Sequence, residues 1–271
     1  MYRIVDSRAI TLRGTIVKNP KTVLITGATG SIGSALALIY AAQGQTLILL
    51  GRKQSVLNNV AAQCEQKGAR VISYASDIQN NQAVMDWLKL ISQTELLDLV
   101  IVNAGVNTHV KSDGSPEEWP EVETLVKTNI LAAMATVHGV LPVMRRRKKG
   151  QIALISSLAA YYGLPITPTY SASKAAIKAY GEGLRGWLCH DGIEVNVIMP
   201  GYVTSPMCDD MPGPKPFLWT AERAARLIQK KLTRNKPRIS FPFPLNVGTW
   251  WLAVLPPSVS QCIVRFLNYR T

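Results

Sequence analysis

TVLITGATGSIG, residues 22–33, is the most informative stretch of this 271-residue sequence. Its first part, Thr22–Thr26, is a run of aliphatic and β-branched residues, which is typical of a buried strand. Three glycines follow at intervals of three residues, and a helical stretch begins at about Ser31. Glycines allow a tight turn and a close approach to the backbone, while free N–H groups at the start of a helix bind phosphate. The order of strand, turn and helix therefore predicts a nucleotide site, with contacts from Gly27, Thr29, Gly30, Ser31, Ile32 and Gly33.

Outward from this stretch, short apolar runs alternate with helical ones. Strands are expected at 22–26, 46–50, 70–74, 98–103, 151–156, 194–199 and 238–241. Helices are expected at 31–43, 54–67, 80–94, 125–144 and 169–190. Such alternation favours βαβ units and a parallel sheet with ligands at the carboxyl ends of the strands. We expect an α/β chain with one doubly wound Rossmann domain, in which helices cover both faces of a mostly parallel seven-stranded sheet.

The two ends of the chain depart from this alternation. Residues 1–20 are expected to be an N-terminal extension, and they lack the continuous apolar core of a signal peptide, which favours a cytoplasmic location. No charged residue occurs between Arg238 and Arg265, and the tail 242–271 contains Trp250 and Trp251. Four prolines interrupt this tail, which argues against a membrane-spanning helix. We expect short helices on the core or on a partner subunit, with contact at a membrane surface as the alternative.

Composition narrows the classes of function. The net charge is +13, and the densest basic cluster, residues 145–149, stands where a helix is expected to end. Cations there complement the helix dipole, and nothing in the pattern supports nucleic-acid binding. The four cysteines are scattered and show no metal-ligand spacing, so we expect single buried thiols and no metal site.

The second expected strand ends at Leu50-Gly51-Arg52-Lys53, where an acidic residue would hold the ribose 2′-hydroxyl of NAD. No acid is present. Because the planar guanidinium of Arg52 suits a 2′-phosphate, the sequence favours NADP over NAD, although a solvated loop arginine is the alternative.

Tyr170-Ser171-Ala172-Ser173-Lys174 opens a later helix. The four-residue offset places Tyr170 and Lys174 on one helix face. An ammonium and a positive nicotinamide ring nearby would lower the pKa of the phenol, which could then exchange a proton with a carbonyl or alcohol oxygen while hydride moves at carbon. Taken alone, such a pair is commonly just helix surface.

In combination these motifs resemble the short-chain dehydrogenase/reductase family over about Lys21 to Phe241. The matching positions are TGATGSIG at 26–33, Asp77-Ile78, Asn103-Ala104-Gly105, Asn129, Ser157, YSASK at 170–174 and Pro200-Gly201-Tyr202-Val203. The resemblance implies a homo-oligomeric enzyme, a dimer or a tetramer, that interconverts a carbonyl and a secondary alcohol.

The resemblance also implies a role for each matching residue. Ser157 orients the substrate oxygen, with Ser156 as the alternative in register, and Tyr170 is the acid or base. Lys174 lowers the pKa of Tyr170 and binds ribose, and Asn129 kinks the long helix and holds a relay water. The further cofactor contacts are Asp77, Ile78, Asn103, Ala104, Gly105, Pro200, Gly201, Val203 and Ser205.

Two positions depart from the family pattern. The glycine spacing is that of the extended branch, which includes sugar-nucleotide epimerases, and Ser31 stands where the short branch has glycine. The chain is too short for that branch's added substrate region, and its other motifs belong to the short branch. Ser205 replaces a threonine but keeps the hydroxyl.

In enzymes of this family the segment after Gly201, residues 207–219, would be the substrate lid. It contains Met, Phe, Leu and Trp, which suggests a hydrophobic ketone, acyl or lipid-like substrate, with packing on the core as the alternative. Two other functions remain alternatives at this point: a sugar-nucleotide-modifying enzyme of epimerase type, and a nucleotide-sensing protein without catalysis.

Overall fold

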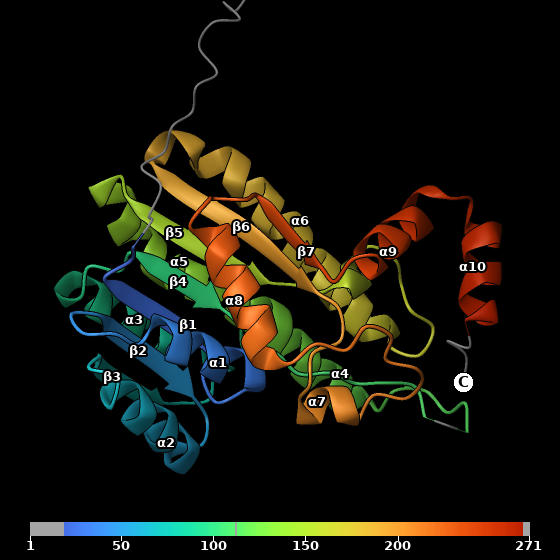
Figure 1. The fold of residues 1–271 in the computed structure, drawn as a ribbon, viewed down its shortest axis with the longest axis horizontal. Coiled ribbons are helices and arrows are strands. Elements are labelled where there is room, and N and C mark those ends of the chain that lie inside the picture. Colours follow the sequence, from blue (N-terminus) through green and yellow to red (C-terminus); the bar gives the residue numbers. More distant parts are fainter. Residues whose placement is uncertain (1–18, 112, 268–271) are drawn as a thin grey trace, which may run out of the picture.

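The computed structural model describes residues 19–111 and 113–267, and its framework is a parallel sheet of seven strands (Figure 1). The strands are β1 (Thr22–Thr26), β2 (Thr46–Gly51), β3 (Arg70–Ala75), β4 (Leu99–Val102), β5 (Gly150–Ile155), β6 (Ile193–Pro200) and β7 (Arg238–Phe241). Their order across the sheet is β3-β2-β1-β4-β5-β6-β7, and every neighbouring pair is parallel. The α/β fold expected from the sequence is confirmed, with a sheet that is wholly parallel.

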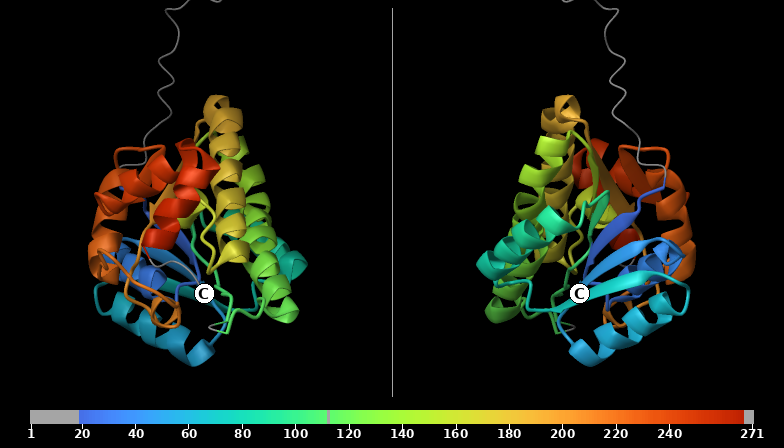
Figure 2. Two further views of the ribbon diagram at one scale, coloured as in Figure 1. Left: turned by 90° about the vertical axis from the view of Figure 1, so that its right-hand side faces the viewer. Right: turned by 90° about the vertical axis from the view of Figure 1, so that its left-hand side faces the viewer.

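Helices cover both faces of the sheet, and Figure 2 shows the three layers edge-on. One face carries α1 (Ser31–Tyr40), α2 (Gln54–Glu65) and α8 (Ala221–Leu232). The other carries α3 (Asn81–Thr94), α5 (Ala132–Arg147) and α6 (Pro168–Leu188). The remaining α-helices are α4 (Trp119–Val126), α7 (Pro206–Asp209), α9 (Leu245–Val254) and α10 (Pro257–Phe266).

The inner strands are buried on both faces because their side chains alternate between two cores. Val23 and Ile25 of β1 pack toward α1 and α8, whereas Leu24 packs toward α3 and α5. All five residues of β1 and all four of β4 are buried. Strands covered on both faces are apolar throughout, and this explains why these segments have no alternation of polar and apolar residues.

The strand order reverses between β1 and β4, which are paired neighbours. The loops that follow these two strands leave in opposite directions, and a crevice forms between them at the carboxyl edge. The fold thus places the glycine-rich turn after β1 and residues 103–105 after β4 beside each other.

The long helix before β5 starts earlier than the sequence analysis expected. Helix α4 begins at Trp119, and a π-helical turn, Lys127–Leu131, joins it to α5. Pro120 lies in the first turn of α4, where a missing N–H costs nothing, so the proline does not prevent an early start. Among the described residues only this stretch, Trp119–Arg147, is long and apolar enough to cross a membrane. It is mostly buried and contributes to the core beside β4 and β5.

After β7 the chain forms two short helices, α9 and α10, separated by Leu255 and Pro256. A proline cannot supply the N–H that a continuous helix needs, which accounts for the break. The strand at 238–241 and the short helices agree with the sequence analysis. The expected extension at 1–20 lies outside the described residues except for Asn19 and Pro20, and the last four residues of the expected tail also lie outside.

The basic cluster ends α5, as expected, and part of it is paired. Arg145 Nε lies 2.7 Å from Asp191, and Arg147 and Lys149 both approach Asp98 at 3.5 Å. All four cysteines are free thiols. The expectation that all four are buried is wrong for Cys262, which is exposed, and for Cys189, which is half-buried, because both lie on outward helix turns.

Candidate active site

A cavity of about 720 Å³ runs along the carboxyl edge of the sheet. Its wall contains the turn after β1, the ends of β2 and β4, the start of α6, the lid segment after β6 and one side of α9 and α10. Eighteen of the expected site residues line it: Gly27, Thr29, Gly30, Ser31, Ile32, Arg52, Asp77, Ile78, Asn103, Ala104, Gly105, Ser157, Tyr170, Lys174, Pro200, Gly201, Val203 and Ser205. Gly33 and Asn129 do not line the cavity but lie directly behind it.

The glycine-rich turn is held against β4 by Asn103. The Asn103 side-chain amide donates to the carbonyls of Thr26 and Gly27 at 3.1 and 3.0 Å. Gly27 has φ +64°, and a Cβ there would lie 2.7 Å from the Cα of Ala104. A Cβ on Gly33 would lie 2.2 Å from the Gly27 carbonyl oxygen. The glycines thus allow the turn, the helix and residue 104 to approach more closely than any side chain would permit.

The first turn of α1 has neither a side-chain cap nor an acidic residue. Thr29, Gly30, Ser31 and Ile32 face the cavity at this point. Unpaired N–H groups and the positive end of the helix dipole favour a phosphate here, and this observation fits a dinucleotide pyrophosphate. Ser31, which departs from the family pattern, lines the cavity at this point.

The far end of the cavity lies at the ends of β2 and β3. Arg52 is exposed and follows Gly51, whose position beside Thr29 leaves no room for a Cβ. Among the described residues no carboxylate forms an ion pair with Arg52. The guanidinium at the cavity edge is therefore available to an anionic ligand. Ile78 is buried beside it, and Asp77 accepts a hydrogen bond from the Gln79 backbone N–H at 3.0 Å.

Tyr170, Lys174 and Ser157 come together at the centre of the cavity. The Lys174 ammonium is almost completely buried, lies 5.6 Å from the Tyr170 ring centroid and donates to the carbonyl of Ile155 at 3.1 Å. Ser157 lies at the end of β5, and its hydroxyl is 3.4 Å from the Pro200 carbonyl. Ser156, the alternative in register, is buried, and its hydroxyl donates to the Lys174 carbonyl at 2.7 Å. Ser156 thus anchors α6 to β5, whereas Ser157 stands beside the tyrosine.

Burial dominates the titration of this group. It raises the pKa of Tyr170, and hydrogen bonding with Ser157 opposes that rise. It also lowers the pKa of Lys174 to about 8. The expected lowering of the Tyr170 pKa by Lys174 is therefore not seen in the protein alone, where burial is the largest cause and the hydrogen bond with Ser157 is the one that opposes it. At neutral pH the phenol is protonated.

Asn129 sits in the π-helical turn and connects three segments. Its amide oxygen accepts from the Val106 N–H at 2.8 Å, and its amide nitrogen donates to the Val106 carbonyl at 2.9 Å and to the Ser173 hydroxyl at 3.0 Å. A Cβ on Gly105 would meet both Asn129 Oδ1 and Lys174 Nζ within 3.3 Å. Asn129 and Lys174 are therefore neighbours across Gly105, and the local break in the α-helix is found where the family resemblance places a kink.

The turn after β6 completes one side of the cavity. Pro200, Gly201 and Val203 line it, and a Cβ on Gly201 would lie 3.0 Å from Pro242. Ser205 has a local role, since its hydroxyl caps α7 by accepting the Cys208 N–H at 3.1 Å. The hydroxyl kept at this position thus fixes the start of the lid.

Sequence reasoning missed most of the largely apolar residues in the rest of the cavity wall. These are Leu158, Tyr162, Leu164, Leu245, Thr249, Leu252, Ile263, Val264 and Leu267. The lid methionines were recognised as a group, but α9 and α10 were not assigned to the site. The long uncharged run before Arg265 was the available signal, and it does not say which side of each helix faces inward.

Comparison with known proteins identifies the family of the chain. The sequence pattern of the family described as short chain dehydrogenase matches residues 21–213. An uncharacterized oxidoreductase of Myxococcus xanthus is 34% identical over 249 residues, covering 92% of this chain and 98% of that protein. One of Mycobacterium tuberculosis is 32% identical, with 88% and 95% covered.

Among solved structures, a short-chain dehydrogenase from Sphingobium yanoikuyae in complex with NADPH superposes with a TM-score of 0.74 at 22% identity, over 90% of this chain and 95% of the other. At that identity the likeness concerns the fold. The family pattern and the relatives together show that the chain is an oxidoreductase of the short-chain dehydrogenase family.

Proposed function

We propose that the protein interconverts a hydrophobic ketone and its secondary alcohol with NADP(H). The observation that carries the proposal is the meeting of Tyr170, Ser157 and Lys174 in one cavity, between a phosphate-binding turn and an apolar wall. Proton transfer to an oxygen needs a donor that is protonated at the working pH and a group that holds the oxygen in place. The tyrosine and the serine supply these two features.

Each polar group is proposed to have one task. Tyr170, protonated at neutral pH, gives its proton to the carbonyl oxygen, and Ser157 donates a hydrogen bond that holds this oxygen beside the phenol. The bound nicotinamide supplies the hydride that the carbonyl carbon receives. In the alcohol-oxidising direction Tyr170 takes the proton back.

Lys174 and Asn129 are proposed to support Tyr170. The ammonium of Lys174 stabilises the phenolate that remains after transfer and donates to a cofactor ribose hydroxyl. Asn129 fixes residues 105 and 106 and the first turn of α6, which sets the position of Lys174 and of a water that returns the proton. The buried amide bonds to the Val106 backbone and to the Ser173 hydroxyl, and these bonds tie the π-helical turn rigidly to two other segments.

NADP is proposed as the cofactor on the strength of Arg52. Its guanidinium borders the cavity after β2, and a 2′-phosphate offers the paired oxygens that such a group binds best. The fold neighbour from Sphingobium yanoikuyae holds NADPH, which is consistent with this choice.

The substrate is proposed to be apolar because the wall opposite the cofactor is built from leucine, isoleucine, valine and methionine side chains. This wall favours the carbonyl oxidoreductase over the sugar-nucleotide enzyme, whose substrate would need many polar partners. The presence of all four expected catalytic residues in one place speaks against a sensor without catalysis.

The proposal is tested with a panel of carbonyl compounds and NADPH, followed at the nicotinamide absorbance. Long-chain and cyclic ketones should turn over faster than sugars, and sugars as the best substrates would overturn the assignment. Fluorescence titration with NADPH and NADH tests the cofactor, and tighter binding of NADH would contradict the role of Arg52.

The homo-oligomeric state and the cytoplasmic location stay predictions. Light scattering of the purified chain measures the first, and a mass of one chain would contradict it.

A further inference from the structure

Helix α9 is apolar on two opposite sides, and only one of them faces the protein. Leu245, Gly248, Thr249 and Leu252 line the cavity. The residues two positions after these four are Val247, Trp250, Trp251 and Val254, and their side chains are 41, 42, 51 and 52% exposed. A displacement of two residues turns the direction of a side chain by about 200° around a helix. The outward side is therefore a continuous apolar stripe without a partner in the described chain.

Helix α10 repeats this arrangement. Ser260 and Val264 are buried, and Ile263 and Val264 line the cavity. Val259 and Phe266 point away from the core and are 43 and 88% exposed. Phe243, before α9, is 78% exposed. We call these outward residues the C-terminal apolar face: Phe243, Val247, Trp250, Trp251, Val254, Val259 and Phe266.

Exposed apolar residues are concentrated at this end of the molecule. Of the 18 large apolar side chains that are exposed in the described residues, 11 lie between Met207 and Leu267. They are Met207, Phe217 and Leu218 of the lid, Leu267, and the seven residues of the C-terminal apolar face. Single exposed apolar residues are ordinary on a protein surface, but a group this dense in one part of the chain marks an interaction site.

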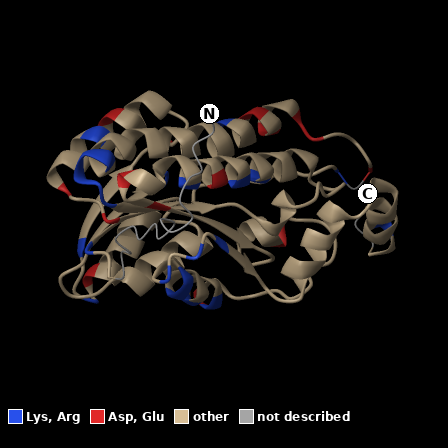
Figure 3. Ribbon diagram, turned by 90° about the horizontal axis from the view of Figure 1, so that it is seen from above, with Lys and Arg blue, Asp and Glu red and all other residues tan. Residues whose placement is uncertain are grey.

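Charge separates this end from the rest of the molecule. No charged residue lies between Arg238 and Arg265, although the chain has 30 lysines and arginines. Figure 3 shows Lys and Arg mainly over the rest of the molecule, away from α9 and α10. Arg265 is exposed and directly precedes Phe266. An uncharged face with tryptophans and a cation at its edge has the composition of a surface that enters the headgroup region of a bilayer.

The length of the helices excludes a transmembrane arrangement. A ten-residue helix is about 15 Å long, half the thickness of the hydrocarbon layer. Their inner sides are also fixed to the domain, since Leu252 and Val264 pack together with Ile166. The face can therefore enter a bilayer only from one side and to a shallow depth.

The cavity wall reaches the surface at Leu267, the residue that follows Phe266 of this face. Leu267 lines the cavity and is also 50% exposed, and α9 and α10 contribute to both surfaces. A hydrophobic substrate concentrates in lipid, so an opening next to the bilayer receives it without passage through water. A protein partner or a second copy on the same face would cover the opening.

We propose that the C-terminal apolar face docks on the surface of a phospholipid bilayer, and that the hydrophobic substrate enters the cavity from the bilayer beside α9 and α10. Docking stands independently of the chemistry, whereas entry of the substrate rests on the proposed function.

Flotation with vesicles of neutral phosphatidylcholine at about 0.5 M salt tests docking. Neutral lipid and short screening lengths suppress attraction by the basic cluster at the end of α5, so only apolar contact is measured. The native protein should float with the vesicles. A variant with Trp250→Ser and Trp251→Ser should bind at least about tenfold more weakly, because the apolar area of two half-exposed indoles is lost.

Trp187→Ser is the matched control. Trp187 is 58% exposed at the end of α6, against the Arg145 guanidinium and far along the chain from α9. This variant should float like the native protein. Unchanged circular dichroism and NADPH binding show that all variants are folded.

Three results would overturn docking: native protein that does not float, equal flotation of the double variant, or equal loss in the Trp187 control. Light scattering tests the remaining alternative, that a second copy of the chain binds to this face. If the native protein remains in the aqueous fraction and the double variant has half the native mass in solution, the face is an interface between copies and the proposal is wrong.

Entry from the bilayer is tested with a long-chain ketone in vesicles and a short-chain soluble ketone. The double variant should lose kcat/KM for the vesicle-borne ketone by about tenfold and keep it for the soluble one. Equal loss on both would overturn entry. Absence of turnover on every ketone would instead contradict the proposed function, while flotation would still decide docking.

Discussion

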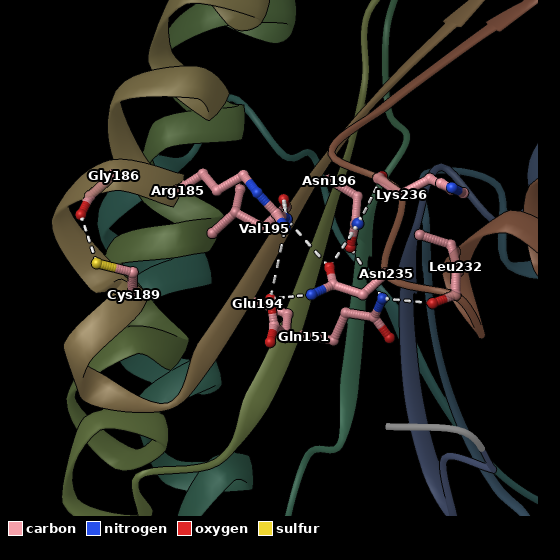
Figure 4. Close-up of polar contacts among 10 residues, drawn as sticks. All are labelled: Gln151, Arg185, Gly186, Cys189, Glu194, Val195, Asn196, Leu232, Asn235 and Lys236. Atoms are coloured by element: carbon pink, nitrogen blue, oxygen red, sulfur yellow. Dashed lines mark hydrogen bonds and ion pairs between the residues drawn. The ribbon is translucent and has the colours of Figure 1, made fainter. Parts of the chain in front are cut away.

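The two ends of the sheet each contain a buried polar cluster, and the clusters differ in how their hydrogen bonds are used. At the amino end, Gln151 donates to the Asn196 side chain at 2.8 Å and to the Leu232 carbonyl at 3.0 Å. Asn196 donates to Asn235 at 3.0 Å and to the Lys236 carbonyl at 2.8 Å (Figure 4). Gln151 and Asn196 are almost completely inaccessible, and the cluster fixes the connection between α8 and β7 to β5 and β6.

At the carboxyl end, the polar groups are bonded to the protein on one side and face the cavity on the other. Lys174 has three N–H donors, and in the described residues one of them has a partner, the carbonyl of Ile155. Tyr170 and Ser157 face the cavity. A cluster whose bonds are complete contributes to stability, whereas one with bonds left over is ready for a ligand. The difference implies that mutations at the two ends affect different quantities.

The largest effect is expected for Tyr170→Phe. Removal of the hydroxyl should lower kcat by roughly 10²- to 10⁴-fold, the range of general acid catalysis, and leave the Kd for NADPH nearly unchanged. Tyr180→Phe on the same helix is the matched control and should keep its activity. Steady-state kinetics and fluorescence titration measure both quantities, and an active Tyr170→Phe enzyme would refute the assigned chemistry.

Gln151→Leu is expected to act on stability alone. It leaves the Asn196 side-chain oxygen without its donor and takes from the Leu232 carbonyl one of two donors, since the Asn235 N–H still donates to it at 2.9 Å. The unpaired buried oxygen should cost about 1–3 kcal/mol in the free energy of unfolding. Urea denaturation measures the loss, and kcat and KM at 25 °C should be unchanged. Gln63→Leu, on the exposed side of α2, should have little effect on either. A large fall in kcat for Gln151→Leu would show that the two clusters are coupled.

Arg52→Ala is expected to weaken NADPH binding by about 10- to 100-fold, the value of a hydrogen-bonded charge pair. NADH binding should change little, because NADH has no 2′-phosphate. Lys53→Ala, at the next position, is the control. Equal losses for the two cofactors would mean that Arg52 supports the fold of the β2–α2 turn instead.

The smallest effect concerns pH. Because burial lowers the pKa of Lys174 to about 8, the ammonium is charged below that pH and neutral above it. The kcat/KM for NADPH, which reports groups in the free enzyme, should therefore fall on the alkaline side, by roughly fourfold between pH 7 and 8.5. A profile that is flat to pH 9.5 would contradict the role of the Lys174 charge.

Much of the fold and of the catalytic group could be predicted because the responsible constraints are local. The strand Thr22–Thr26 is followed at once by glycines that a tight turn needs, and Tyr170 and Lys174 share a helix face by their spacing. The strand boundaries at 22–26 and 238–241 agree with the structure because apolar and β-branched runs end sharply at proline, glycine and polar residues.

Contacts between distant segments were not predictable in this way. Whether Ser156 or Ser157 faces the tyrosine depends on how β5 is placed against α6, and only the bond from Ser156 to the Lys174 carbonyl shows it. The same applies to the buried Gln151, which resembles any polar residue at the start of a strand.

The sequence by itself determined the order of strands and helices, the phosphate-binding turn and the spacing of Tyr170 and Lys174, since each depends on residues within a few positions of one another. Only the tertiary structure decided which side of α9 and α10 lines the cavity and which is left exposed. Both sides of α9 are apolar, so its sequence pattern does not indicate which side faces the core. The inner side is decided by the packing of Leu252 and Val264 against Ile166, a residue far away in the chain.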